Sequence, residues 1–579
     1  MKKLFVIVII LGILVIGLIL LTKNNSNSQK TNQPGFSIEG GNLSKAQNLS
    51  TVVLPHFDFA KDTRQKLIRE LAKKIKPREI IILSVNHFSL GDSDILTTDK
   101  SWNFDKSNPK IDNILFNKIV EANIAKPFDN AFEGEHGIKN VLPDLSSEFK
   151  EAEYLPIIIK NGTSREKLDG LIKSLEANCH DCLLVSSIDF SHYNPDSLSQ
   201  IHDQMSLAAL SDKDSDKALL AETDSPEVFY MTIEWAKHKE FQQFTLSDWS
   251  NSSKDTNSPD RETTSYILGY YSNSKSEKKA EDTTTFLFAG DMMFDRMVNH
   301  QFKTGGLDHI FDNFGERVFW GTDIAFANLE GPISADPIDD NISANNLIFD
   351  FPPESIKALK SIRLNGVSLA NNHTLNAGRG GLETTKGLLG RANIIHAGEQ
   401  SKFSDESIIR YDSTIPVSII VVNMLEDPGD DKIIEKIKSE KSASRFVIVF
   451  PHWGNEYDLK HSKSQENVAH KFIDAGCDLI VGSHPHVVQD VGIYRGKAII
   501  YSLGNFVFDQ TFSKDTQIGL ILGGIISKTG VELSFFPTKQ IKLKPEISSG
   551  DDKNKLLQRI LPENSGYETV RDDTIKLIR

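Results

Sequence analysis

The sequence predicts an α/β protein preceded by one transmembrane helix. Apolar runs of strand length alternate with longer amphipathic stretches of helix length throughout residues 49–545. A chain of 579 residues with 39% hydrophobic and 25% charged residues can form more than one buried core. Polar segments interrupt the alternation at residues 23–48 and 272–283, so we expect two α/β domains, at 49–271 and 284–545.

Residues 1–22 carry the membrane signal. Two lysines precede an unbroken apolar stretch from Leu4 to Leu21, which approaches the roughly 20 residues needed to cross a bilayer core. A cleaved signal peptide is the alternative, but no Ala-x-Ala-like site follows the stretch. The lysines favour a cytoplasmic amino terminus. We therefore expect a single-pass anchor in the cell membrane, a flexible stalk at 23–48 and the bulk of the chain outside the cytoplasm.

Charge and cysteine content narrow the classes of partner. The formal net charge of -14 and the absence of a basic stripe in the sequence argue against nucleic acid. Three cysteines are too few for a disulfide scaffold. Cys179 and Cys182, in the order Cys-His-Asp-Cys, resemble half of a zinc site or a redox pair; a local disulfide or two ordinary thiols are the alternatives.

Six apolar runs between Phe286 and Phe508 end at side chains that bind metals. In chain order these side chains are Asp291, Asn328 with Glu330, Asn372 with His373, His452, His484 with His486, and Asn505. The carboxyl ends of parallel strands in an open α/β sheet share one rim, so we expect these residues to converge. Carboxylate, amide and imidazole ligands without thiolate suit Mn, Fe, Zn or Mg, and the set is large enough for two ions.

The motifs around these residues resemble those of a known family. GDMMFDR, ANLEGP, LANNHTLNAG, PHWGNEY, GSHPHVVQ and YSLGNFVFD occur in this order between residues 284 and 540. In order and content they resemble the capsule synthesis protein CapA family, which is associated with poly-γ-glutamate production. The resemblance implies a fold similar to that of calcineurin-type metallophosphoesterases, a two-layered sheet sandwich flanked by helices.

The same resemblance implies roles for individual residues. The metal ligands would be Asp291, Glu330, Asn372, His452, His484 and His486. Asp291 would be the first carboxylate ligand and Glu330 a bridging one. His373 would protonate a leaving oxygen, which makes His373 and Asp291 catalytic candidates. Arg296, the third, either binds an anionic substrate or pairs with a neighbouring carboxylate.

Four motifs in residues 50–271 resemble a second family. VVLPHFDF, LSVNHFS, EGEHGIKNVLP and SSIDFSHY resemble the Memo-like family, also called AmmeMemoRadiSam system protein B, whose fold is similar to class III extradiol dioxygenases. The implied site consists of the ligands His56 and His87, the pocket residues Asp189 and His192, and His136 with Glu135 on its wall. Two histidines and one further ligand suit a single Fe or Cu ion.

This first site departs from its family at the third ligand. The family commonly carries a Cys-Gly segment, whereas residues 222–227, ETDSPE, contain no cysteine. Asp224 could substitute as an oxygen ligand. The domain then holds either a working redox centre or a scaffold for substrate binding.

The end of the chain predicts two further features. IGLILGGII and GVELSFFP, with Thr529-Gly530 between them, predict a hairpin added at the edge of the sheet. Residues 546–579 are charged and predict a tail with one helix and otherwise disorder.

These observations predict a membrane-anchored, metal-dependent hydrolase. Its substrate would be a phosphoester or an anionic cell-surface polymer such as poly-γ-glutamate, and the Memo-like domain would be accessory. One alternative is a non-catalytic factor that exports or tethers the polymer through bound metal. The other is a redox metalloprotein that works through the Memo-like domain.

Overall fold

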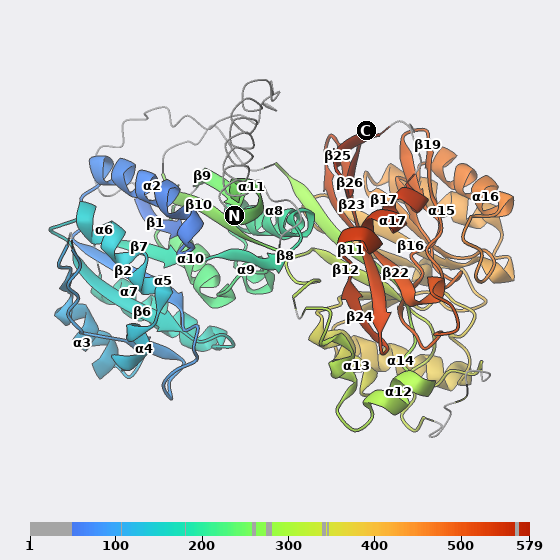
Figure 1. Ribbon diagram of the computed structural model, residues 1–579, viewed down its shortest axis with the longest axis horizontal. Helices are drawn as coiled ribbons and strands as arrows, with labels where there is room; N and C mark the ends of the chain where they lie inside the picture. The colour runs from blue at the N-terminus through green and yellow to red at the C-terminus, as the bar shows by residue number, and fades with distance from the viewer. Residues whose placement is uncertain are drawn as a thin grey trace, which may run out of the picture. The chain divides into compact units, whose positions relative to one another are not determined.

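The computed structural model describes most of the chain from residue 49 to residue 578 (Figure 1). Within that range it leaves out residues 106, 180, 242, 257–261, 274–280, 316, 338–342, 344–346 and 562–566. The described residues belong to one unit, Asn42–Arg579.

The predicted fold class and localisation are corrected at the amino terminus. The described chain is a mixed α/β structure with three sheets, and no helix in it is both long and apolar enough to cross a membrane. Its longest helix, α8 (Asp196–Asp212), has 17 residues and carries polar side chains along its length. The predicted anchor, Leu4–Leu21, lies outside the described residues. The expected single-pass membrane protein, with its bulk outside the cytoplasm, therefore has no structural support.

Residues 49–272 form the first sheet, in the order β5-β3-β6-β2-β7-β1-β10-β8, with β4 beside β6 and β9 beside β10. Its strands are β1 (Leu49–Leu54), β2 (Glu79–Val85), β3 (Ile95–Thr97), β4 (Lys110–Ile111), β5 (Lys126–Pro127), β6 (Glu153–Ile159), β7 (Cys182–Ser187), β8 (Phe190–Asn194), β9 (Gln243–Asn251) and β10 (Thr263–Ser272). The central strands β1, β7, β2 and β6 are parallel, so their carboxyl ends share one edge.

Helices cover both faces of this sheet (Figure 1). They are α2 (Lys61–Lys74), α3 (Asn113–Glu121), α4 (Asn130–Glu133), α5 (His136–Lys139), α6 (Leu142–Glu148), α7 (Arg165–Asn178), α8, α9 (Ser215–Leu220), α10 (Pro226–His238) and α11 (Ser252–Thr256), with the 3-10 turn η3 (Asp58–Ala60). In β2, Ile80 and Ile82 pack into one core and Ile81 and Leu83 into the other. A strand buried on both faces explains its continuous apolar sequence.

The second sheet has the order β14-β13-β12-β11-β22-β23-β26-β25, with β21 beside β11 and β24 beside β23. Its strands are β11 (Thr283–Met292), β12 (Ile324–Leu329), β13 (Gly366–Ser368), β14 (Ile395–Ala397), β21 (Asn505–Val507), β22 (Ile518–Ser527), β23 (Gly530–Ile541), β24 (Lys544–Ile547), β25 (Glu568–Arg571) and β26 (Thr574–Ile578).

The third sheet has the order β15-β16-β17-β18-β20-β19. Its strands are β15 (Ile408–Tyr411), β16 (Val417–Asn423), β17 (Phe446–His452), β18 (Leu479–Val481), β19 (Val491–Tyr494) and β20 (Lys497–Ile500). The helices of this half are α12 (Arg296–Phe302), α13 (Ser355–Ser361), α14 (Gly378–Arg391), α15 (Asp430–Ser442), α16 (Lys463–Asp474) and α17 (Gly550–Ile560), with the 3-10 turns η4 (Leu307–Phe311), η5 (Asp405–Ser407), η6 (Met424–Glu426) and η7 (Asp515–Gln517).

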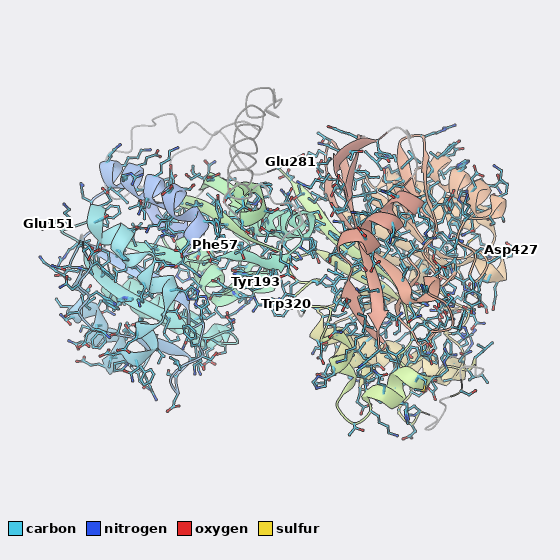
Figure 2. The ribbon with its side chains drawn as sticks, viewed as in Figure 1. Phe57, Glu151, Tyr193, Glu281, Trp320 and Asp427 are labelled. Atoms are coloured by element: carbon cyan, nitrogen blue, oxygen red, sulfur yellow. A yellow bond between two sulfur atoms is a disulfide. The ribbon has the colours of Figure 1, made fainter. Side chains whose placement is uncertain are left out.

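One core joins the second and third sheets. Phe286 and Phe288 of β11 lie in it with Ile448 and Phe450 of β17, and the rings of Phe288 and Phe450 are stacked 5.9 Å apart. Figure 2 shows how densely side chains fill the space around these strands. The metal-binding clusters therefore follow strands of two facing sheets. The single rim expected from one open sheet is wrong, because β17 and β18 pair with β16 and β20 and not with β11 to β13; the family resemblance had implied two sheet layers.

The carboxyl-terminal segments extend the second sheet. Strands β22 and β23 form the predicted hairpin, but β22 pairs with β11 in the middle of the sheet and not at its edge. The tail contains the predicted helix, α17, but Glu568–Arg571 and Thr574–Ile578 form a second hairpin on β23. Leu577 and Ile575 are buried in the shared core, which explains why this charged segment is ordered.

Candidate metal centres

Three elements bring Asp291, Glu330 and His452 together. Asp291 lies on β11, Glu330 follows β12, and His452 ends β17. Each of the three offers a ligand atom within 4.8 Å of the other two, and all three are buried. The strand-end residues of two facing sheets thus converge, although they come from separate sheets.

A second group, Glu456, His484 and His486, adjoins the first. Their ligand atoms also lie within 4.8 Å of one another. The two groups meet at His486, whose Nδ1 is 3.4 Å from Asp291 Oδ2 and whose Nε2 is 3.5 Å from Glu330 Oε1. The sequence analysis did not name Glu456 as a candidate ligand, although its place four residues after His452 in PHWGNEY was a usable signal.

Asparagines hold this cluster in place. Asn328 Nδ2 donates to Asp291 Oδ1 at 2.8 Å and to Glu330 Oε2 at 3.1 Å. Asn371, which the sequence analysis did not single out, donates to Asn328 Oδ1 at 3.0 Å. Asn372 Oδ1 is 2.8 Å from His452 Nε2. Asn505 Oδ1 is 3.0 Å from His486 Nδ1, so every predicted asparagine reaches the cluster or a neighbour of it.

Two buried polar atoms of the cluster fit a bound cation. Glu330 Oε1 and His484 Nδ1 make no hydrogen bond with any described residue. Burial, reinforced by the Asp291 carboxylate, raises the pKa of Glu330 well above its ordinary value. Burial also lowers the pKa of His484 to about 4, which leaves a neutral imidazole. A buried carboxylate beside the neutral imidazole of His484 is part of a donor set for hard or borderline divalent ions. Burial alone would lower the pKa of His486, but the Glu330 and Asp291 carboxylates outweigh it and raise that pKa to about 9.

His373 and Arg296 lie beside this cluster. The His373 ring packs on Phe349 with 4.2 Å between ring centroids, and its Nδ1 is 3.0 Å from Asn376 Oδ1. Burial lowers the pKa of His373 below its ordinary value. Arg296 is buried and forms an ion pair with Asp509. Of the two roles considered for Arg296, pairing with a neighbouring carboxylate is the one the contacts support.

The Memo-like motifs form a second centre at the carboxyl ends of β1, β2 and β7. His56 Nε2 is 3.2 Å from Asp189 Oδ2 and 3.1 Å from Asp224 Oδ2. His87 Nε2 is 3.6 Å from the same Asp224 oxygen. The aspartate in the segment that lacks the family's cysteine therefore lies between both histidines.

Further carboxylates and imidazoles surround this group. Glu135 is fully buried and its Oε1 is 2.6 Å from His87 Nδ1. The His136 ring lies 3.8 Å from that of His87, and the ligand atoms of His56, His87 and His136 are within 4.8 Å of one another. His192 donates its backbone N–H to Glu222 at 2.8 Å, and its Nδ1 makes no hydrogen bond with any described residue.

Burial and the contacts among these histidines and carboxylates determine their pKa values. Burial alone would lower the pKa of His87, but its contacts with Asp224 and Glu135 raise it to about 9. Burial lowers the pKa of His136 to about 4, helped by the neighbouring imidazoles. Burial would raise the pKa of Asp224, but His56 and His87 hold it below its ordinary value. Asp224 is therefore an ionised carboxylate, the state that binds metal.

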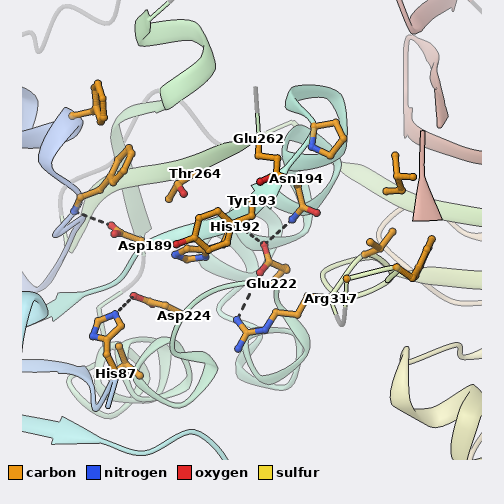
Figure 3. Close-up of a pocket in the computed structure, with 18 of the residues that line it drawn as sticks. His87, Asp189, His192, Tyr193, Asn194, Glu222, Asp224, Glu262, Thr264 and Arg317 are labelled. Carbon is orange, nitrogen blue, oxygen red and sulfur yellow. Dashed lines mark hydrogen bonds and ion pairs between the residues drawn. The ribbon is translucent and has the colours of Figure 1, made fainter. Parts of the chain in front are cut away.

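This centre opens on a large cavity (Figure 3). The cavity has a volume of about 1260 Å³ and is lined by His56, His87, His136, Asp189, His192 and Asp224. Tyr193 and Glu222 lie beside His192 in the same close-up. Arg317 and Lys553, from the second half of the chain, also line the cavity. A ligand bound there would touch both halves.

Comparisons with known proteins agree with this division. The family model for the bacterial capsule synthesis protein PGA_cap matches residues 285–510, and the model for Memo-like protein matches residues 27–270. The PGA biosynthesis protein CapA of Bacillus subtilis is 30% identical over 259 residues, which cover 42% of this chain and 68% of that protein. This chain belongs to the CapA family.

Two further relatives extend the comparison. The capsule biosynthesis protein CapA of Bacillus anthracis is 28% identical over 323 residues, covering 52% of this chain and 78% of that protein. A MEMO1 family protein of Caldivirga maquilingensis is 25% identical over 156 residues, covering 26% of this chain and 55% of its own length. The chain therefore fuses a Memo-like domain to a CapA-like domain, which confirms the two predicted resemblances.

Proposed function

We propose that the CapA-like domain is a metal-dependent hydrolase whose substrate is a phosphoester or an anionic polymer of the polyglutamate type. The supporting observation is the buried cluster of two adjoining ligand groups, Asp291 with Glu330 and His452, and Glu456 with His484 and His486. The polymer is suggested by the relatives, whose names refer to capsule and PGA biosynthesis.

In this proposal one set of residues holds the metal ions, a second positions the ligands, and His373 donates a proton. The two ligand groups would hold two divalent ions among Mn, Fe, Zn and Mg, which when bound supply an activated water and a clamp for the reacting oxygens. Asn328 and Asn371 fix the carboxylates, which keeps Asp291 and Glu330 close despite their like charge. His373 would donate a proton to the leaving oxygen from its Nε2, since Nδ1 is turned to Asn376.

The test combines metal content with hydrolysis. Purified protein is loaded with Mn, its metal is counted, and it is assayed with an aryl phosphomonoester, an aryl phosphodiester and polyglutamate. We expect His373→Ala to keep its metal and lose at least about 100-fold in rate, whereas Glu330→Gln should lose metal. His309→Ala is the matched control, because His309 is an exposed histidine paired with Asp312. Metal binding without hydrolysis of any substrate would favour the tethering alternative.

A second proposal concerns the Memo-like domain. His56, His87 and Asp224 would hold one Fe or Cu ion, and Asp224 would take the place of the family's cysteine. The support is that Asp224 Oδ2 lies 3.1 Å from His56 Nε2 and 3.6 Å from His87 Nε2, so one carboxylate oxygen faces both histidines. Asp224→Asn should abolish metal retention in this domain, while Asp224→Cys should restore it with altered metal preference. Equal metal retention by Asp224→Asn would contradict the proposal.

A further inference from the structure

Glu79, Cys179 and Cys182 form a third cluster, at the amino ends of strands β2 and β7. The Memo-like centre lies at the carboxyl ends of the same strands. Strands β2 and β7 are parallel, and Glu79 pairs with Cys182 at their amino ends while Ser84 pairs with Ser187 at their carboxyl ends. Ser187 contacts His56, whereas Cys182 begins β7 and Cys179 follows helix α7. The cysteines therefore lie apart from the residues assigned to either metal centre.

Glu79 contacts both sulfur atoms. Cys179 and Cys182 form a disulfide, and their Cα atoms lie 5.8 Å apart. Glu79 Oε2 lies 3.0 Å from each Sγ. In the dithiol form both S–H groups can donate to this oxygen. In the disulfide form neither sulfur atom carries a hydrogen to donate. The Glu79 carboxylate then loses both donors, which favours the protonated form of Glu79.

Burial and charge around the cluster agree with this exchange of a proton. Cys179 is fully buried, whereas Cys182 is only partly so, which makes Cys182 the accessible sulfur. Burial raises the pKa of Glu79 above its ordinary value. The carboxylates of Asp112, Glu153 and Asp181 raise it further, whereas Arg78, 3.8 Å from Glu79 Oε1, lowers it. A carboxyl group with a raised pKa keeps its proton to a higher pH and can release it to a thiolate.

We propose that Cys179 and Cys182 are a redox-active pair that exchanges with an external dithiol, and that Glu79 delivers the proton. A thiolate of the external dithiol attacks Cys182 Sγ, the Cys179–Cys182 bond breaks, and Cys179 leaves as a thiolate that takes the proton of Glu79. The second thiol of the dithiol then attacks its own sulfur in the mixed disulfide, and Cys182 leaves and takes that thiol's proton.

The overall step is balanced. Two electrons and two protons pass to the cysteines, and the external dithiol becomes a disulfide. The proton lost by the first attacking thiol returns through water to Glu79. The reverse sequence oxidises the pair. The chemistry requires only a dithiol or disulfide partner and no metal.

The test uses the full chain with Cys477→Ser, which removes the buried third cysteine. The oxidised protein is treated with dithiothreitol, and the appearance of two thiols is followed with a thiol reagent between pH 5 and pH 9. Glu79→Gln should slow reduction about tenfold below pH 7 and flatten the pH profile. Glu166→Gln is the control, because Glu166 is an exposed carboxylate in the first turn of α7, at the other end of that helix from Cys179.

Three results would overturn the proposal. The first is a disulfide that dithiothreitol cannot reduce without unfolding the protein. The second is a Glu79→Gln variant, confirmed as folded by circular dichroism, whose reduction rate matches that of Glu166→Gln at every pH. The third is stoichiometric zinc bound by the reduced cysteines, since Glu79, Cys179 and Cys182 also offer three ligand atoms to a metal. Glu79→Asp should restore part of the rate if the carboxyl group is responsible.

Discussion

The two candidate metal centres differ in the surroundings of their carboxylates. In the CapA-like domain Asp291 and Glu330 are fully buried and accept hydrogen bonds from Asn328. In the Memo-like domain Asp224 faces two imidazoles and a cavity of about 1260 Å³. The first pair of carboxylates also faces an imidazole, His486; burial alone would lower its pKa, but the Glu330 and Asp291 carboxylates outweigh burial and raise that pKa to about 9. The two candidate centres therefore differ in access, since the carboxylates of the first are fully buried and Asp224 of the second faces a cavity.

The strongest test of this contrast is a substitution that closes the space beside Asp291. A Cβ added to Gly290 would lie 1.9 Å from the backbone oxygen of Gly504, which also accepts the Asp291 amide. Strand β11 would have to move away from Gly504, so Gly290→Ala should cost about 3 kcal/mol or more of stability. It should also remove metal from the CapA-like centre. Thermal unfolding and metal analysis measure both effects.

The matched control is Gly380→Ala on helix α14. A Cβ at Gly380 meets no atom within 4 Å, so this change should leave melting temperature and metal content intact. Equal behaviour of the two variants would show that the packing beside Asp291 does not position the cluster.

Removing one ligand from each centre should separate the two. Asp291→Ala should weaken metal binding in the CapA-like domain at least about 100-fold and leave the Memo-like domain unchanged, because a lost ligand costs more than the 10- to 100-fold typical of its supporting contacts. His56→Ala should do the reverse. Titration of the metal-free protein with Mn and with Fe resolves the two sites. If either variant loses both sites together, the centres are not independent.

The sequence predicted which residues converge better than it predicted their strand pairing. Asp291, Glu330 and His452 could be expected to cluster because each ends an apolar run and is one of the residue types that bind metal. Local periodicity did not show their division between two sheets, because strand pairing depends on contacts far apart in the chain; only the family resemblance, which implied a two-layered sandwich, indicated it. Local periodicity likewise predicted the β22–β23 hairpin but not its place beside β11.

Residues that support the centres were harder to find. Asn371 sits beside the predicted Asn372 but acts by holding Asn328, a contact across 43 positions of the chain. Arg317 reaches the cavity of the other domain, which no local pattern could indicate. Supporting contacts of this kind depend on tertiary packing, whereas ligands have a characteristic chemistry of their own.

Substitution of Arg317, in the CapA-like half, should have a smaller effect on metal binding at the Memo-like centre. Arg317 Nη1 donates to the backbone oxygen of Thr223 at 2.7 Å and faces Glu222 Oε1 at 3.7 Å, immediately before Asp224. Arg317→Met should loosen this segment and weaken metal binding at the Memo-like centre about tenfold. The CapA-like centre should be unaffected, although Arg317 belongs to that half of the chain. Arg379→Met, at an exposed arginine paired with Glu399, is the control for loss of charge.

The smallest predicted effect concerns Asp203, which belongs to neither centre. It lies on α8, fully buried, where Ser265 Oγ donates to it at 2.6 Å and Trp249 Nε1 at 2.7 Å. Burial raises its pKa from 3.8 to about 7. Because the folded pKa is the higher one, protonated Asp203 contributes stability that is complete below about pH 4 and is lost as the pH rises through 7.

Replacing Asp203 with Asn should remove this pH dependence. An amide cannot accept both hydrogen bonds as a carboxylate does, so Asp203→Asn carries a cost of about 1–3 kcal/mol that does not vary with pH. The free energy of unfolding of the wild type should therefore fall by about 1 kcal/mol relative to that of the variant between pH 6 and pH 7. Urea unfolding of both proteins at each pH measures the difference, in which other titrating groups cancel. A difference that stays the same at both pH values would mean that Asp203 is ionised throughout, and that α8 tolerates a buried charge.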